Sequence, residues 1–408
     1  MLLMKNKPAL AIIFLTIFID LLGFGIIMPL LPSFSVNVLH INELTIGLMV
    51  GIYSLMQFFF NPVWGSLSDR YGRKPVLVMS LIGGVISNLL LAFVFSGIIL
   101  SAFLFITARA FAGIFAANIS AAQAVISDIT SPEDRTKGIS LISTAFAMGF
   151  VFGPAIGGIL SENFGYAFPV YVSAAMSLIA SLLCIFVFKE SLPHEVQLRN
   201  RLNKKIINPL NFGNFYKALK NKSYGVFMII FFVSVFSFSN IFGTIQLFAG
   251  RPEGLNFNQA EIGYLFSYMG ITGGLVQVIF VNFFKRMIGE ENSLVLGCFI
   301  TIFGLGLIGF SVTVPFLLLV IATLSLGNGI SSTVSISLLS QNAGKEEQGS
   351  VLGLNQSLGS FARFLGPVWG GFVYQFFGYK FPFLTGSLFM LIITVFSYLF
   401  FKKRKLSH

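Results

Sequence analysis

Charged residues are scarce in this chain of 408 residues, since Asp, Glu, Lys and Arg together make up only 10% of it. Soluble globular proteins carry about 25% charged residues, so the composition excludes an ordinary soluble domain. Cysteine is almost missing as well, and Cys184 and Cys298 fall in apolar segments of different halves. Neither a disulfide framework nor a metal-ligand spacing is present.

Patterns of catalytic residues are also missing. The three histidines lie in loops or in the tail, and the sequence has no Ser/His/Asp set, metal cluster or phosphate-binding loop. Residues 304–309 match the glycine spacing of a dinucleotide fingerprint, but they lie inside an apolar run with no preceding strand. The sequence therefore predicts that the protein is not an enzyme and has no cofactor and no metal.

Long apolar runs dominate what is present, and 55% of all residues are hydrophobic. A run of about 20 apolar residues is long enough to cross a bilayer as a helix. The runs predict an all-α membrane protein with twelve transmembrane helices, at about 9–32, 44–64, 75–95, 99–124, 138–160, 166–188, 224–247, 261–284, 293–312, 314–338, 350–374 and 380–401.

The net charge of +11 is distributed unevenly about these spans. Every Lys and Arg lies in loops on the side of the N-terminus, except Arg251 and Lys380 on the opposite side and Arg109 and Arg363 within spans. This bias follows the positive-inside rule, so both termini are expected in the cytoplasm. A nucleic-acid patch would need a folded soluble surface, so we expect no nucleic-acid partner and interpret the charge as a topology and lipid-contact signal.

One hydrophilic stretch divides the chain into two halves. The sequence predicts an N-terminal six-helix bundle (1–188), a cytoplasmic linker (189–223) and a C-terminal six-helix bundle (224–408). The linker is too short for a core of its own. The halves repeat, because GP-x-x-GG, FGY and FP in the segment from Asp134 recur at one constant offset in the segment from Glu347.

Four motifs suggest a family. GSLSDRYGRKPVL (Gly65–Leu77) places charged and turn-forming residues between the second and third spans, and LGFGIIMPLLP, ARAFAG and GFVFGPAIGG stand in spans 1, 4 and 5. With them the chain resembles the drug:proton antiporter branch of the major facilitator superfamily, and particularly the tetracycline exporters. The resemblance implies two six-helix bundles around a central cavity and a monomer in a bacterial inner membrane, which exports a small molecule using the proton gradient.

Asp20 is the only carboxylate in the middle of a predicted span. A carboxylate inside the membrane can exchange protons during a transport cycle, and the resemblance gives Asp20 the proton-linked position. The alternative is a hydrogen-bonded structural residue. Arg109 in span 4 stays charged and needs a partner, for which Asp20 is a candidate. The resemblance assigns Arg109 to proton coupling, and hydrogen bonding to carbonyls is the alternative.

The resemblance also implies a conformational latch at the signature turn. In the family the carboxylate at Asp69 accepts from the N-terminus of helix 11, where unpaired amides favour an anion. Arg73 would pair with Asp128 at the cytoplasmic end of helix 4. The alternative, a solvated turn, explains the basic residues but not Asp69 or Gly72. The predicted latch residues are Gly65, Asp69, Arg70, Gly72, Arg73 and Asp128.

Glycines recur at every fourth position of span 5, which clears one helix face for close approach of another backbone. In the resembling family this run is associated with export, although a structural helix contact explains the spacing equally well. The predicted motif, with its repeat in span 11, comprises Gly149, Gly153, Pro154, Gly157, Gly158, Gly366 and Pro367.

Polar residues inside spans are candidates for a substrate cavity, although most of them are expected to serve helix packing. They are Tyr53, Gln57, Asn118, Gln123, Asn240, Gln277, Asn328, Asn355 and Arg363. Arg363 is expected either to contact an anionic substrate group or to be held by Asp20. Ser87 and Asn88 stand where tetracycline exporters have an acidic residue, so the predicted substrate is another organic solute. A symporter or facilitator for a nutrient is the second interpretation, and a receptor without transport the third.

Overall fold

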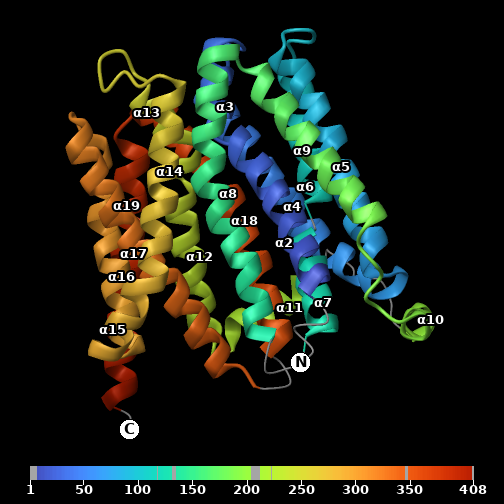
Figure 1. The fold of residues 1–408 in the computed structure, drawn as a ribbon. Helices are drawn as coiled ribbons and strands as arrows, with labels where there is room; N and C mark the ends of the chain where they lie inside the picture. The colour runs from blue at the N-terminus through green and yellow to red at the C-terminus, as the bar shows by residue number, and fades with distance from the viewer. Residues whose placement is uncertain are drawn as a thin grey trace. The chain divides into compact units, whose positions relative to one another are not determined.

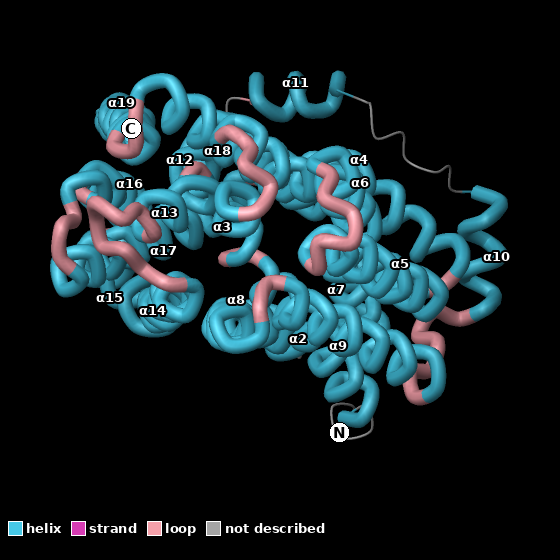
Figure 2. The backbone as a smooth tube through the Cα atoms, turned by 90° about the horizontal axis from the view of Figure 1, so that it is seen from above, coloured by secondary structure: helices cyan, strands magenta, loops and turns pink. Residues whose placement is uncertain are grey.

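The computed structural model describes residues 7–116, 118–130, 135–203, 212–221, 223–344 and 348–406. These residues form helices joined by short loops, and no strand occurs among them (Figure 2). Ten of the described helical segments are long and apolar enough to cross a membrane. The all-α membrane fold predicted from the apolar runs is confirmed.

The first of two compact units holds residues 1–39, 52–210 and 258–267. Within it α2 packs along α8 and α9, and α5 packs along α9 (Figure 1). Apolar side chains such as Ile17, Leu77 and Val125 fill the space between these helices. The described helices up to residue 203 are α2 (Lys7–Ile27), α3 (Leu30–Asn37), α4 (Glu43–Tyr71), α5 (Arg73–Phe95), α6 (Ala102–Phe115), α7 (Asn118–Ile129), α8 (Arg135–Phe164), α9 (Ala167–Phe186) and, within the linker, α10 (His194–Asn203).

The second unit holds residues 40–51, 211–257 and 268–408. In this unit α16 packs on α17 and α19, and α12 packs on α18. It holds the part of α14 (Gln259–Leu275) from residue 268 onward. Its other helical elements are α11 (Phe212–Lys220), α12 (Gly225–Ser239), α13 (Ile241–Ala249), a π-helical turn (Val276–Phe280), α15 (Val281–Ile288), α16 (Glu290–Gly306), a short 3-10 turn (Ile308–Phe310), α17 (Val314–Asn342), α18 (Gln348–Phe377) and α19 (Phe381–Leu406). The predicted bundle boundaries at 188 and 224 stay predictions.

The two predicted spans outside these ten segments are 99–124 and 350–374. The first is broken into α6 and α7, and the second lies in α18, which carries Asn355 and Arg363. At the end of α6, the indole of Trp64 donates to the carbonyl of Ile114 and the hydroxyl of Ser80 donates to that of Phe115. Side chains thus satisfy backbone groups that the break frees, as an apolar environment requires. The continuous apolar run gave no sign of the break.

The internal repeat extends to the backbone. Helices α8 and α18 have 30 residues each and a proline at the same place, Pro154 and Pro367. Both are followed by the glycine of an FGY motif, with φ of 81° at Gly165 and 100° at Gly378. Glycine adopts this left-handed conformation without the steric cost that other residues pay, which is why it ends helices so often.

Candidate functional site

The signature segment forms a much shorter turn, here called the corner, than its sequence suggests. Helix α4 continues to Tyr71 and α5 begins at Arg73, so only Gly72 separates them. Gly72 has a φ of 109°, and a β-carbon at this position would collide with the carboxylate of Glu190. Both the conformation and the close approach therefore require glycine.

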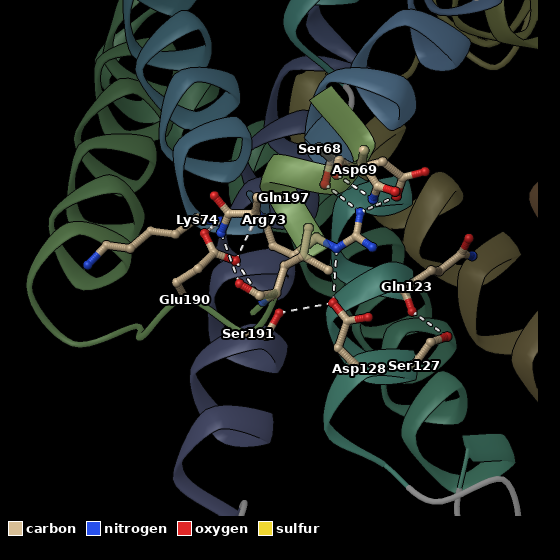
Figure 3. A network of polar contacts seen from close by, with 12 residues as sticks. Ser68, Asp69, Arg73, Lys74, Gln123, Ser127, Asp128, Glu190, Ser191 and Gln197 are labelled. Carbon is tan, nitrogen blue, oxygen red and sulfur yellow. Dashed lines mark hydrogen bonds and ion pairs between the residues drawn. The ribbon is translucent and has the colours of Figure 1, made fainter. Parts of the chain in front are cut away.

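Arg73 is the centre of the polar network at this corner (Figure 3). Its side chain is buried, and its Nε donates to Asp128 at 2.9 Å while one terminal nitrogen donates to Asp69 at 2.7 Å and to Ser68 at 3.0 Å. The pair that the resemblance implied between Arg73 and Asp128 is therefore present. All these residues belong to the first unit, so the network joins α4, α5 and α7 within that unit.

Helices α5 and α9 cap each other's ends. The two carboxylate oxygens of Glu190, just after α9, accept from the amides of Arg73 at 2.9 Å and Lys74 at 3.0 Å (Figure 3). The ammonium of Lys74 donates to the carbonyl of Ile185, in the last turn of α9, at 2.7 Å. An anion at a helix N-terminus and a cation at a C-terminus are both favoured by the helix dipole. Sequence reasoning missed Glu190, although it follows the sixth span directly.

The remaining predicted latch residues differ in their surroundings. The guanidinium of Arg70 donates to the carbonyl of Arg201 in α10 at 3.1 Å. No described atom lies within 4 Å of the position of a β-carbon at Gly65, so nothing in the described chain requires glycine there. The contact expected between Asp69 and the start of helix 11 stays a prediction.

Asp20 is half-buried on α2 and faces α5 and α9. A β-carbon built at Gly84 would lie 3.8 Å from Oδ1 of Asp20 and 3.7 Å from the hydroxyl of Ser177. The amide of Asn88 donates to the hydroxyls of Ser173 at 3.1 Å and Ser177 at 3.4 Å. The carboxylate of Asp20 and the hydroxyl of Ser177, which belongs to this amide and hydroxyl group, thus both lie near Gly84.

Arg109 lies in an aromatic setting on α6. It is 4% exposed, and its guanidinium carbon is 4.8 Å from the ring centre of Tyr53 and 5.9 Å from that of Phe24. Its Nε makes no described hydrogen bond. Cation–π contacts of this kind are worth more when the cation is desolvated. Pairing of Arg109 with Asp20 stays a prediction.

The glycine face of α8 lies against α2. β-Carbons at Gly149 and Gly153 would lie within 3 Å of backbone atoms of Leu21 and Gly25. In the second unit the repeated glycine, Gly366, faces the backbone of α12 in the same way. A β-carbon at Gly157 would contact the backbone of Ile26, and one at Gly158 would contact the backbone of Gln259. β-Carbons at Gly263 and Gly47 would contact the backbones of Pro154 and Pro367, respectively. The backbones approach closely, and a role in export stays a prediction.

The cavity candidates do not form one described cluster. Asn240 and Asn355 are buried in the second unit, whereas Gln123 and Gln277 are exposed. Tyr53, Gln57 and Asn328 are half-buried, and Arg363 donates to the hydroxyl of Ser360 at 3.0 Å. The side chain of Asn118 lies outside the described part of the chain. Sequence reasoning missed Gln246, which is buried with no described hydrogen bond to either amide atom.

The fold and the signature corner define a class of protein. The family model described as Major Facilitator Superfamily matches residues 13–367 and 227–408. The chain belongs to this superfamily of transporters and is a multi-pass membrane protein.

Proteins similar in sequence to this chain include multidrug and tetracycline resistance proteins. "Multidrug resistance protein 2" of Bacillus subtilis (strain 168) is 30% identical over 394 residues, which cover 95% of this chain and 94% of that protein. "Tetracycline resistance protein, class C" of Escherichia coli is 29% identical over 367 residues, covering 90% and 89%. Among solved structures, the nucleoside transporter NupG has a TM-score of 0.75 at 16% identity, covering 97% of this chain and 99% of that one. That last likeness concerns the fold alone.

Proposed function

We propose that this transporter exports an organic solute in exchange for protons, by alternating access across a bacterial inner membrane. The observation that carries the proposal is the position of Asp20, a carboxylate on a membrane-spanning helix beside polar side chains of α5 and α9. The names of the relatives, multidrug and tetracycline resistance proteins, support export as the direction.

The polar neighbours of Asp20 suit a group that changes its protonation state. A hydroxyl such as that of Ser177 can donate to a carboxylate and accept from a carboxylic acid. The amide of Asn88 donates to the hydroxyls of both Ser177 and Ser173. An amide does not titrate, so Asn88 does not compete with Asp20 for the proton. Protonation of Asp20 then neutralises the carboxylate. A neutral side chain costs less free energy than a charged one when α2 changes its position within the membrane.

The Arg73 network supports a cycle with distinct states. Charge-assisted hydrogen bonds are short and strong, so the corner between α4 and α5 is a rigid element that a change of access must move or break. We assign the latch role to this network as a whole, with Asp69 as the residue that meets the start of α18 in one state.

The test is solute accumulation by inside-out vesicles that contain the full-length protein and carry an imposed pH gradient. A panel of amphipathic drugs, siderophores, sugars and amino acids is first screened by thermal shift to choose the solute. An exporter accumulates the solute inside these vesicles and releases protons on solute addition. Accumulation only in right-side-out vesicles would establish a symporter, and binding without movement in either would establish a receptor.

A further inference from the structure

The linker contributes a helix that docks on the signature corner with polar side chains. Gln197 and Asn200 of α10 are buried, whereas Leu198 and Leu202 on the same helix are exposed, the latter by 86%. A helix held by apolar packing would bury its leucines against the protein or the membrane and expose its amides. The burial of its amides indicates that α10 is held by specific hydrogen bonds.

These bonds end on the last turn of α4. The side-chain amide of Asn200 donates to the carbonyl of Asp69 at 2.9 Å. The guanidinium of Arg201 donates to the carbonyl of Arg70 at 3.1 Å, and that of Arg70 donates back to the carbonyl of Arg201 at 3.1 Å. The Arg201 guanidinium also lies over the ring of Tyr71, at 4.9 Å from its centre.

The linker thereby supplies a partner for each of four backbone groups that two main-chain hydrogen bonds would otherwise pair. In a continuous helix the amides of Arg73 and Lys74 would donate to the carbonyls of Asp69 and Arg70, four residues earlier. The turn at Gly72 breaks both bonds. Glu190 accepts from the two freed amides, and Asn200 and Arg201 donate to the two freed carbonyls.

We propose that the linker segment from Glu190 to Arg201 is a clasp that holds the corner between α4 and α5 bent at Gly72. When the clasp is undocked, four backbone groups lose their partners and the corner is free to change shape. Glu190 and Asn200 are then positioning residues for the signature turn. The link from clasp to transport rests on the proposed function, whereas the clasp itself does not.

A buried reporter cysteine tests the clasp without any solute. Ser68, which is 1% exposed, is replaced by Cys in full-length protein whose two buried native cysteines have been changed to Ala. Reaction with a water-soluble maleimide is followed in detergent micelles. In this background N200A and E190A are each expected to speed the reaction of Cys at position 68 about tenfold or more, because each removes hydrogen bonds that hold the corner.

Matched controls separate the clasp from general loosening. L202A changes an exposed residue of the same helix and should leave the reaction rate within about twofold of the parent. E190D keeps the carboxylate and should restore part of the protection. A reporter at Ser181, also 1% exposed but within α9, should react equally slowly with and without N200A.

Amide exchange gives a second measurement, since E190A but not L202A should speed hydrogen exchange at Arg73 and Lys74. Unchanged reaction of the Ser68 reporter in both N200A and E190A would overturn the clasp. An equal increase at the Ser68 and Ser181 reporters would also overturn it, because the whole unit would then be loosened. Failure of the vesicle experiment would remove the proposed function and leave these outcomes as they are.

Discussion

The Arg73 network allows a quantitative prediction for the substitution Asp128→Asn. The guanidinium of Arg73 is buried, and Asp128 accepts from it at 2.9 Å. A hydrogen bond to a charged group contributes about 1.5–3 kcal/mol, whereas a buried ion left with no partner costs about 3–5 kcal/mol. Because Asp69 at 2.7 Å remains as a partner, the smaller range applies. We expect Asp128→Asn to lower the free energy of unfolding by about 2 kcal/mol.

The assay is a double-mutant cycle with Arg73→Ala, in which unfolding is titrated with denaturing detergent in mixed micelles. A direct pair should give a coupling energy of at least about 0.5 kcal/mol. Glu253→Gln, at an exposed loop carboxylate, is the control and should change the free energy of unfolding by less than about 0.5 kcal/mol. Additive effects of Arg73→Ala and Asp128→Asn would refute the reasoning.

Three further predictions concern other parts of the chain. Gly153→Val should destabilise the protein by about 1–3 kcal/mol, because its side chain would meet the α2 backbone, whereas Gly353→Ala, where no described atom lies within 4 Å, should be neutral or stabilising in the same unfolding assay. Hydrogen bonding from Arg251 lowers the pKa of Tyr379, so the phenolate absorbance of Tyr379, obtained by difference with Tyr379→Phe, should rise at lower pH than in Arg251→Gln. The interaction favours the ionised phenol, so its contribution to stability grows as pH rises through the pKa of Tyr379 and is lost as pH falls through it. A cysteine placed at Asn221 in the linker should resist an impermeant reagent in intact cells, and labelling there would contradict the cytoplasmic assignment.

The length of the apolar runs was sufficient to predict the helical membrane fold, because a run of about 20 apolar residues favours transfer into a bilayer as a helix. The repeat was also visible, since an FGY glycine in left-handed conformation and a mid-helix proline leave a fixed pattern at Gly165 and Gly378. The break at the end of α6 was not visible. The backbone groups freed there are satisfied by partners such as Trp64, which is 50 residues away in the sequence.

The signature corner was predicted in part. Spacing and resemblance indicated Arg73 and Asp128, but they did not indicate that Glu190, more than a hundred residues away, caps α5. Such a contact follows from which helix ends meet in space, and a hydrophilic linker sequence carries no pattern that specifies it. The polar neighbours of Asp20 on α9 were missed for the same reason, since isolated serines in a span usually serve packing.

The central claim is that Asp20 carries the transported proton. Asp20→Asn keeps the size and hydrogen bonding of the side chain but fixes it as neutral. In inside-out vesicles with an imposed pH gradient, this variant should still bind the solute but should neither accumulate it against its gradient nor release protons when solute is added. Uphill accumulation by Asp20→Asn with unchanged pH dependence would contradict the account.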